Sequence, residues 1–141
     1  MHRSKLSGFI IDCQGDDLDG AAGFWGNALG MRQETLPAAE AGKYKRLQDR
    51  QHGLHIEVQI VAHPSRVHLD IETDDIEAEV QRLEKLGAKR VQEVSRWWVM
   101  EAPTGQRFCV VRADSPDFER LATPKSVSGF TCSRVSRFDQ P

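Results

Sequence analysis

The sequence contains little cysteine, almost no excess charge and no long apolar run. Its three cysteines are too few and too scattered for a disulfide framework or a paired-cysteine zinc site, which favours a reducing, cytoplasmic environment. The formal net charge of −2 offers no electrostatic basis for binding nucleic acid or an anionic membrane. No apolar run approaches the ~20 residues that span a bilayer, and the basic start leads into a strand-like segment rather than a signal peptide. The 141 residues fit one domain that can bury a core.

An internal repeat divides the chain into two units. The segment "IDCQGDDLDGAAGFWGNALG" at 11–30 aligns with "LDIETDDIEAEVQRLEKLG" at 69–87, with paired aspartates at the same place in both. A second pairing follows between "GLHIEVQIV" at 53–61 and "GQRFCVVRA" at 105–113. Two segments of about 50 residues that repeat the same order predict a duplicated structural unit.

Each unit is predicted to fold as a strand, a helix and three further strands. An alternating strand opens each unit, and apolar residues at helical spacing follow it. Aspartate pairs at 16–17 and 74–75 suit helix N-caps. Gly30 and Gly87 suit the left-handed position after a helix. The remaining strands are expected at 31–34, 43–48, 54–61, 89–94, 97–101 and 107–112.

Residues 1–113 are therefore predicted to form one domain, with units at about 5–62 and 66–113. The tail, residues 114–141, lies outside the repeat and mixes serine, threonine, proline and arginine. By composition it is either flexible or docked on the domain or on a dimer partner. Its anchors in the docked case are three aromatic residues, Phe118, Phe130 and Phe138.

The repeat predicts an α+β fold, in which a curved mixed sheet carries helices on its outer face and forms a cleft on the other. Because strand side chains alternate, the two faces can be assigned separately. The residues predicted to face the cleft are Asp12, His55, Glu57, Gln59, His68, Asp70, Arg107 and Cys109, together with Trp98. Val67, Leu69 and Ile71 are predicted to pack under the helices.

A solvated sheet face would explain any one of these polar residues taken alone. The repeat favours a site, because it places Ile10, Glu57, His68 and Cys109 at equivalent positions of four strands. A merely solvated face does not require that symmetry.

The chain resembles the vicinal-oxygen-chelate superfamily of glyoxalase I, extradiol dioxygenases and bleomycin-resistance proteins, and within it the glyoxalase-like domain proteins. The segments that carry the resemblance are "GFIIDCQGDDLDGAAGFWGNALGM", "VHLDIETDDIEAEVQRLEKLGAKRV" and "WVMEAPTGQRFCVV". Metal-dependent members hold a divalent ion at four strand positions, which correspond here to Ile10, Glu57, His68 and Cys109. Isoleucine cannot bind a metal, so the candidate ligands are Glu57, His68 and Cys109, a set that would suit zinc. Asp70 beside His68 is expected to orient the imidazole or to bind a cationic group rather than to complete the metal site.

Three functions remain open at this stage. The first is a glyoxalase-like small-molecule-binding protein without a complete metal site, acting by sequestration or by acid–base catalysis through His68 with Asp70 or Glu57. The second is a lyase or dioxygenase that depends on a divalent metal. The third is a non-catalytic module that dimerises or binds a peptide. The resemblance also implies a homodimer, and Arg107 is expected to pair either with an anionic ligand or with Glu57.

Overall fold

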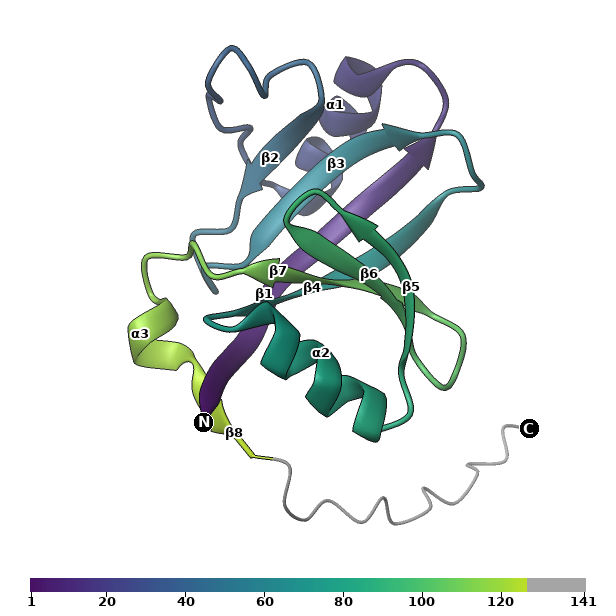
Figure 1. Ribbon diagram of the computed structural model, residues 1–141. Helices are drawn as coiled ribbons and strands as arrows, with labels where there is room; N and C mark the ends of the chain where they lie inside the picture. The colour runs from purple at the N-terminus through teal and green to yellow at the C-terminus, as the bar shows by residue number, and fades with distance from the viewer. Residues whose placement is uncertain (127–141) are drawn as a thin grey trace, which may run out of the picture.

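The computed structural model describes residues 1–126, and its elements follow the predicted order in both units, except that the first unit lacks one predicted strand (Figure 1). The elements are β1 (His2–Gln14), α1 (Leu18–Leu29), β2 (Tyr44–Gln48), β3 (His55–Val61), β4 (Arg66–Thr73), α2 (Ile76–Lys85), β5 (Lys89–Val94), β6 (Trp97–Glu101), β7 (Arg107–Arg112), α3 (Phe118–Leu121) and β8 (Thr123–Lys125). None of the helices in residues 1–126 has the length and apolar character needed to cross a membrane.

The two longer helices begin and end where the sequence predicts. Asp17 caps α1 by accepting a hydrogen bond from the Gly20 N–H at 2.9 Å. Asp75 caps α2 in the same way, accepting from a backbone N–H at 3.0 Å. Gly30 and Gly87 have φ angles of 67° and 102°, the left-handed region in which glycine ends a helix without steric cost.

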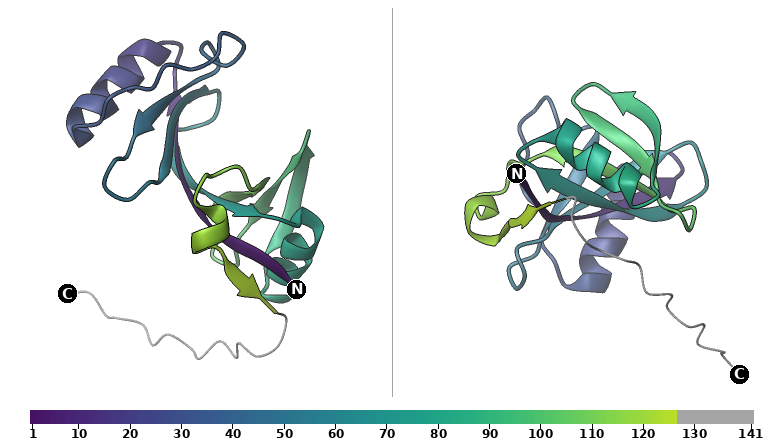
Figure 2. Two further views of the ribbon diagram at one scale, coloured as in Figure 1. Left: turned by 90° about the vertical axis from the view of Figure 1, so that its left-hand side faces the viewer. Right: turned by 60° about the horizontal axis from the view of Figure 1, so that its bottom comes forward.

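The strands form one mixed sheet in the order β2-β3-β1-β4-β7-β6-β5, and β8 pairs with the beginning of β1. Within each unit the first and last strands are parallel, β1 with β3 and β4 with β7. The units join through the antiparallel pair β1 and β4, which places Ile10 opposite His68. Figure 2 shows the two units on either side of this junction, each with its own helix. The α+β class and the mixed sheet are confirmed.

One predicted strand is almost absent. Residues 31–34 contribute only an isolated bridge between Gln33 and Leu47. Their partner β2 has only five residues and lies near the end of the sheet. Few of its backbone groups are therefore available to pair with another strand.

Each helix covers its own unit and leaves the junction uncovered (Figures 1 and 2). α1 packs on β2 and β3, whereas α2 packs mainly on β5, β6 and β7. The prediction that Val67 and Leu69 pack under the helices is wrong, because they are 59% and 43% exposed on the junction strand β4. The two cores consist of Ile11, Ala22, Leu47, Ile56 and Val58 in the first unit and Val80, Leu83, Met100, Phe108 and Val110 in the second.

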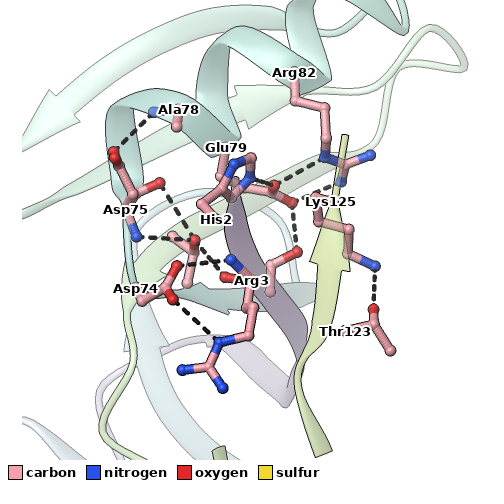
Figure 3. Close-up of polar contacts among 11 residues, drawn as sticks. His2, Arg3, Asp74, Asp75, Ala78, Glu79, Arg82, Thr123 and Lys125 are labelled. Atoms are coloured by element: carbon pink, nitrogen blue, oxygen red, sulfur yellow. Dashed lines mark hydrogen bonds and ion pairs between the residues drawn. The ribbon is translucent and has the colours of Figure 1, made fainter. Parts of the chain in front are cut away.

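A buried carboxylate fastens α2 to the beginning of β1 (Figure 3). Glu79 is fully buried and accepts a hydrogen bond from Ser4 Oγ at 2.9 Å. Arg82 donates to it through Nε at 2.9 Å and Nη2 at 2.7 Å, and His2 Nε2 lies 2.5 Å away. Burial alone would raise the pKa of Glu79, but the hydrogen bonds from Arg82, His2 and Ser4 lower it to about 2. The start of the chain is thus tied to the second unit.

Part of the predicted tail lies against the domain. Phe118 is buried in α3, under the Arg3 guanidinium, which lies 5.6 Å from the ring centroid. β8 then extends the sheet beside the first residues of β1. The other two predicted anchors, Phe130 and Phe138, lie outside the described residues.

Candidate functional site

A cavity of about 490 Å³ lies on the sheet face opposite the two cores and spans both units. Its volume falls within the roughly 300–1,000 Å³ of typical small-molecule sites. Paired strand residues share one face, and the register sets Ile10 beside both Glu57 and His68, and Asp70 beside Cys109. All eight polar residues predicted to face the cleft line this cavity: Asp12, His55, Glu57, Gln59, His68, Asp70, Arg107 and Cys109.

The tryptophan that lines the cavity is not the predicted one. Trp97 lines the cavity, whereas Trp98 packs against the core of the second unit, with the Arg90 guanidinium 4.9 Å from its ring centroid. The register between β6 and β7 explains the error. It sets Val99 opposite Cys109, on the cavity face, so that Trp97 shares this face and Trp98 points the other way.

We call the part of the cavity lining formed by Asp12, His68, Asp70 and Cys109 the cavity floor. His68 is held there by a buried carboxylate. Its Nδ1 lies 2.7 Å from Asp12 Oδ2, and Gln59 Nε2 donates to Asp12 Oδ1 at 2.6 Å. Asp12 is 2% exposed. Burial alone would raise the pKa of Asp12, but the hydrogen bonds from His68 and Gln59 outweigh it and lower the pKa. Because an ionised Asp12 can only accept, Nδ1 carries the proton and a neutral His68 keeps its lone pair on Nε2.

Asp70 and Cys109 lie beside that free nitrogen. Asp70 Oδ1 is 3.5 Å from His68 Nε2, too far for a good hydrogen bond, and this buried oxygen has no hydrogen-bond partner among the described residues. Burial raises the pKa of Asp70 to about 6, although the charge of His68 acts to lower it. Burial, helped by the charges of Asp70 and Asp12, raises the pKa of Cys109 to about 12. The floor therefore disfavours further negative charge.

Glu57 belongs to a separate cluster in the first unit. Its carboxylate contacts His55 Nε2 and lies 3.2 Å from Arg46 Nη2. Burial alone would lower the pKa of His55, but the hydrogen bond to Glu57 raises it. Arg107 does not pair with Glu57, because its Nη2 lies 3.1 Å from the Glu101 carboxylate.

Several cavity residues were missed from the sequence. Arg66 lies in phase with His68 and Asp70 on β4, so alternation alone could have found it; its Nε is 3.7 Å from Asp12 Oδ2. Others required the tertiary structure, because they come from β2, the loop after β3 or the end of β7. The missed lining residues include Tyr44, Arg46, His63, Arg66, Trp97 and Arg112.

The comparisons with known proteins agree with this architecture. The family model described as "Glyoxalase-like domain" matches residues 8–111. The chain belongs to this family. It is therefore a member of the vicinal-oxygen-chelate superfamily, as its sequence predicts. The match covers both units of this glyoxalase-like protein and the whole cavity floor from Asp12 to Cys109.

Solved structures share the fold at low sequence identity. Methylmalonyl-CoA epimerase from Mycobacterium tuberculosis is 16% identical with a TM-score of 0.55, over 77% of this chain and 89% of that one. A hypothetical protein from Bacillus halodurans is 12% identical with a TM-score of 0.56, over 79% and 95%. The Mn(II)-bound glyoxalase from Novosphingobium aromaticivorans is 13% identical with a TM-score of 0.55, over 79% of this chain and 40% of that one. No curated protein matches the chain.

The four strand positions that bind metal in the superfamily do not suit a metal here. Ile10 offers no donor atom, and the Glu57 carboxylate is engaged by His55 and Arg46. The three donors that do converge are His68, Asp70 and Cys109, whose ligand atoms all lie within 4.8 Å of one another. Asp70, which the sequence analysis leaves outside the metal site, is one of these three converging donors. Side chains two residues apart on one strand project side by side, and that proximity lets both reach one ion.

Proposed function

We propose that this glyoxalase-like protein binds a small organic molecule in the cleft and exchanges a proton with it through His68. The observation that carries the proposal is the Asp12–His68 pair on the floor of a cavity of ligand size. A carboxylate bound to Nδ1 sets the tautomer of the imidazole and leaves Nε2 to accept a proton from the ligand.

Four residues support His68 in this role without reacting themselves. Asp12 fixes the imidazole plane and stabilises the imidazolium that forms when Nε2 takes a proton. Gln59 holds the second oxygen of Asp12, so the carboxylate cannot rotate away from the ring. Trp97 supplies a flat apolar wall against which a ligand can pack. Asp70 lies beside Nε2, where it can steer the ligand group that exchanges the proton.

The test is a screen of small carbonyl and carboxylate compounds against the full chain, first for thermal stabilisation and then for C–H exchange in D2O followed by NMR. A ligand present at about 100 times its Kd stabilises the folded state by ~2.7 kcal/mol, enough for a measurable rise in Tm. We expect His68→Gln to slow exchange of the bound compound by roughly 10²–10⁴-fold. Asp16→Asn, an exposed change outside the cleft, is the matched control.

Exchange by His68→Gln at the wild-type rate would refute the proton-transfer role. Stabilisation by no compound, with a cleft that excludes all of them, would favour the non-catalytic module instead.

A lyase or dioxygenase that depends on a divalent metal is the second candidate. The observation in its favour is the convergence of His68, Asp70 and Cys109. Such an ion would supply a Lewis acid facing the cavity. Its donors would be these three residues rather than Glu57, which weakens the analogy with the metal-dependent members of the superfamily.

We also propose a homodimer that works in the cytoplasm. The exposed Val67 and Leu69 on the uncovered side of β4 support association with a second copy of the chain. The low cysteine content supports the compartment.

A further inference from the structure

The Asp12–His68–Asp70–Cys109 floor has the chemistry of an ion site, and this site differs from that of the superfamily. Three donors of different kinds, an imidazole, a carboxylate and a thiol, lie within 4.8 Å of one another. They converge because β4 carries His68 and Asp70 on one face, and the parallel register places Cys109 of β7 directly beside Asp70. All three donors belong to the second unit, and the pairing of its first and last strands brings them together.

The hydrogen bonds around the donors orient them toward a common point. Asp12 binds Nδ1 of His68 and so directs Nε2 toward Asp70, the carboxylate–histidine arrangement that commonly orients a metal-binding imidazole. Gln59 in turn fixes Asp12. The buried Oδ1 of Asp70 has no hydrogen-bond partner in the described part of the chain, which leaves a costly unsatisfied acceptor beside a free nitrogen lone pair.

The local charges also favour a cation. Two carboxylates lie at the donor set: Asp70 has an oxygen within 4.8 Å of Cys109 Sγ, and Asp12 Oδ2 is 2.7 Å from His68 Nδ1. A divalent ion would satisfy Asp70 Oδ1 and would stabilise the thiolate of Cys109 by direct coordination.

We propose that His68 Nε2, the Asp70 carboxylate and Cys109 Sγ bind a thiophilic divalent cation of the zinc class, with a fourth position open to the cavity. Zinc accepts nitrogen, oxygen and sulfur donors, and its catalytic sites commonly use three protein ligands and one open position. Magnesium and calcium, which prefer six or more oxygen donors, fit this set poorly. On binding, the S–H bond of Cys109 breaks, the sulfur–metal bond forms, and the proton leaves to solvent.

The inference does not rest on the proposed proton transfer. A bound ion takes the Nε2 lone pair that proton transfer needs, so ion and proton compete for the same nitrogen. We expect stoichiometric zinc to block the C–H exchange of the proposed function and a chelator to restore it.

The test is titration of the full-length, metal-stripped protein, purified without an affinity metal, with Co²⁺ followed by absorption and with Zn²⁺ followed by calorimetry. We expect one ion per chain and a sulfur-to-cobalt charge-transfer band. Cys109→Ser should abolish the band, while Cys13→Ser, which changes a thiol of β1 outside the cavity lining, should leave it unchanged. His68→Gln and Asp70→Asn should weaken zinc binding more than 100-fold, and Asp12→Asn, which acts through His68, by roughly 10–100-fold.

Glu57→Gln separates this site from that of the superfamily, because Glu57 occupies a superfamily position but lies outside the proposed donor set. We expect Glu57→Gln to keep wild-type zinc affinity. The proposal is overturned if Glu57→Gln weakens binding while Asp70→Asn does not. It is also overturned if the band survives in Cys109→Ser, or if wild-type binding is far below one ion per chain. Circular dichroism confirms that each variant is folded, and the exchange assay on metal-free protein stays informative whichever result is obtained.

Discussion

The ion cluster that ties β1 to α2 makes stability depend on pH in a defined window. Glu79 is fully buried, and its pKa falls from an ordinary 4.5 to about 2. At about 1.4 kcal/mol per pKa unit, the ionised carboxylate contributes ~3 kcal/mol to the free energy of unfolding, as an order of magnitude. Because the folded pKa lies below the unfolded one, this contribution is complete above about pH 5 and is lost as the pH falls toward about 2.

The substitution Glu79→Gln removes the charge and sets an amide N–H2 against the donors of Arg82 and Ser4. We expect the free energy of unfolding near pH 7 to fall by roughly 3 kcal/mol, a large part of the stability of a small domain. The difference between wild type and variant should shrink steadily as the pH falls from about 5 toward about 2, because Glu79 takes up a proton in the unfolded chain while the folded carboxylate stays ionised.

The assay is urea unfolding followed by tryptophan fluorescence and circular dichroism, at several pH values from neutral to about 3. Glu77→Gln on the same helix is the matched control. Glu77 pairs with Arg90 at 2.7 Å but its side chain is 56% exposed, so its loss should cost at most ~1 kcal/mol. A Glu79→Gln cost equal to that of the control, or a cost that does not change with pH, would refute the reasoning.

Three further predictions concern the cavity wall, the sheet and the uncovered junction. Trp97→Ala should weaken binding of a cleft ligand, measured by calorimetry, with little change in Tm. Trp98→Ala should lower the free energy of unfolding by roughly 2–5 kcal/mol, measured by thermal unfolding. The reverse pattern would contradict the assignment of the two faces. Gly8→Ala should lower the free energy of unfolding by about 3 kcal/mol or more, because the added Cβ would lie 1.8 Å from a backbone oxygen of β3. Urea unfolding close to that of the wild type would contradict this and show that the two strands can separate there. Val67→Glu and Leu69→Glu should dissociate a homodimer in light-scattering measurements while leaving Tm nearly unchanged, and a monomeric wild type would contradict the dimer.

Local patterns predicted the features that depend on near neighbours in the chain. The aspartate caps and terminal glycines of both helices are confirmed, because a cap is decided within one helical turn. Alternation placed eight polar residues on one face, and all eight line the cavity, because the side-chain period of a strand is two whatever the strand pairs with.

Long-range pairing decided the rest. The register of β6 on β7 chose Trp97 rather than Trp98 for the cavity, and a shift of one residue would have reversed that choice. The positions of the helices over the outer strands left Val67 and Leu69 exposed, although their pattern is that of buried residues. The parallel pairing of β4 with β7 brought Cys109 to Asp70, and the antiparallel pairing of β1 with β4 brought Asp12 to His68.

The repeat and its alternation thus defined the elements, their faces and the polar wall of a cleft, since these follow from periods of two and 3.6 along one chain. Which side chains of that wall contact one another was decided only by the pairing of the strands in the sheet. Contacts between residues about 40 to 56 positions apart depend on strand order and register, which no local pattern specifies. The tertiary structure alone therefore separated the His68 centre from the Glu57 cluster and moved the candidate ion site onto Asp70.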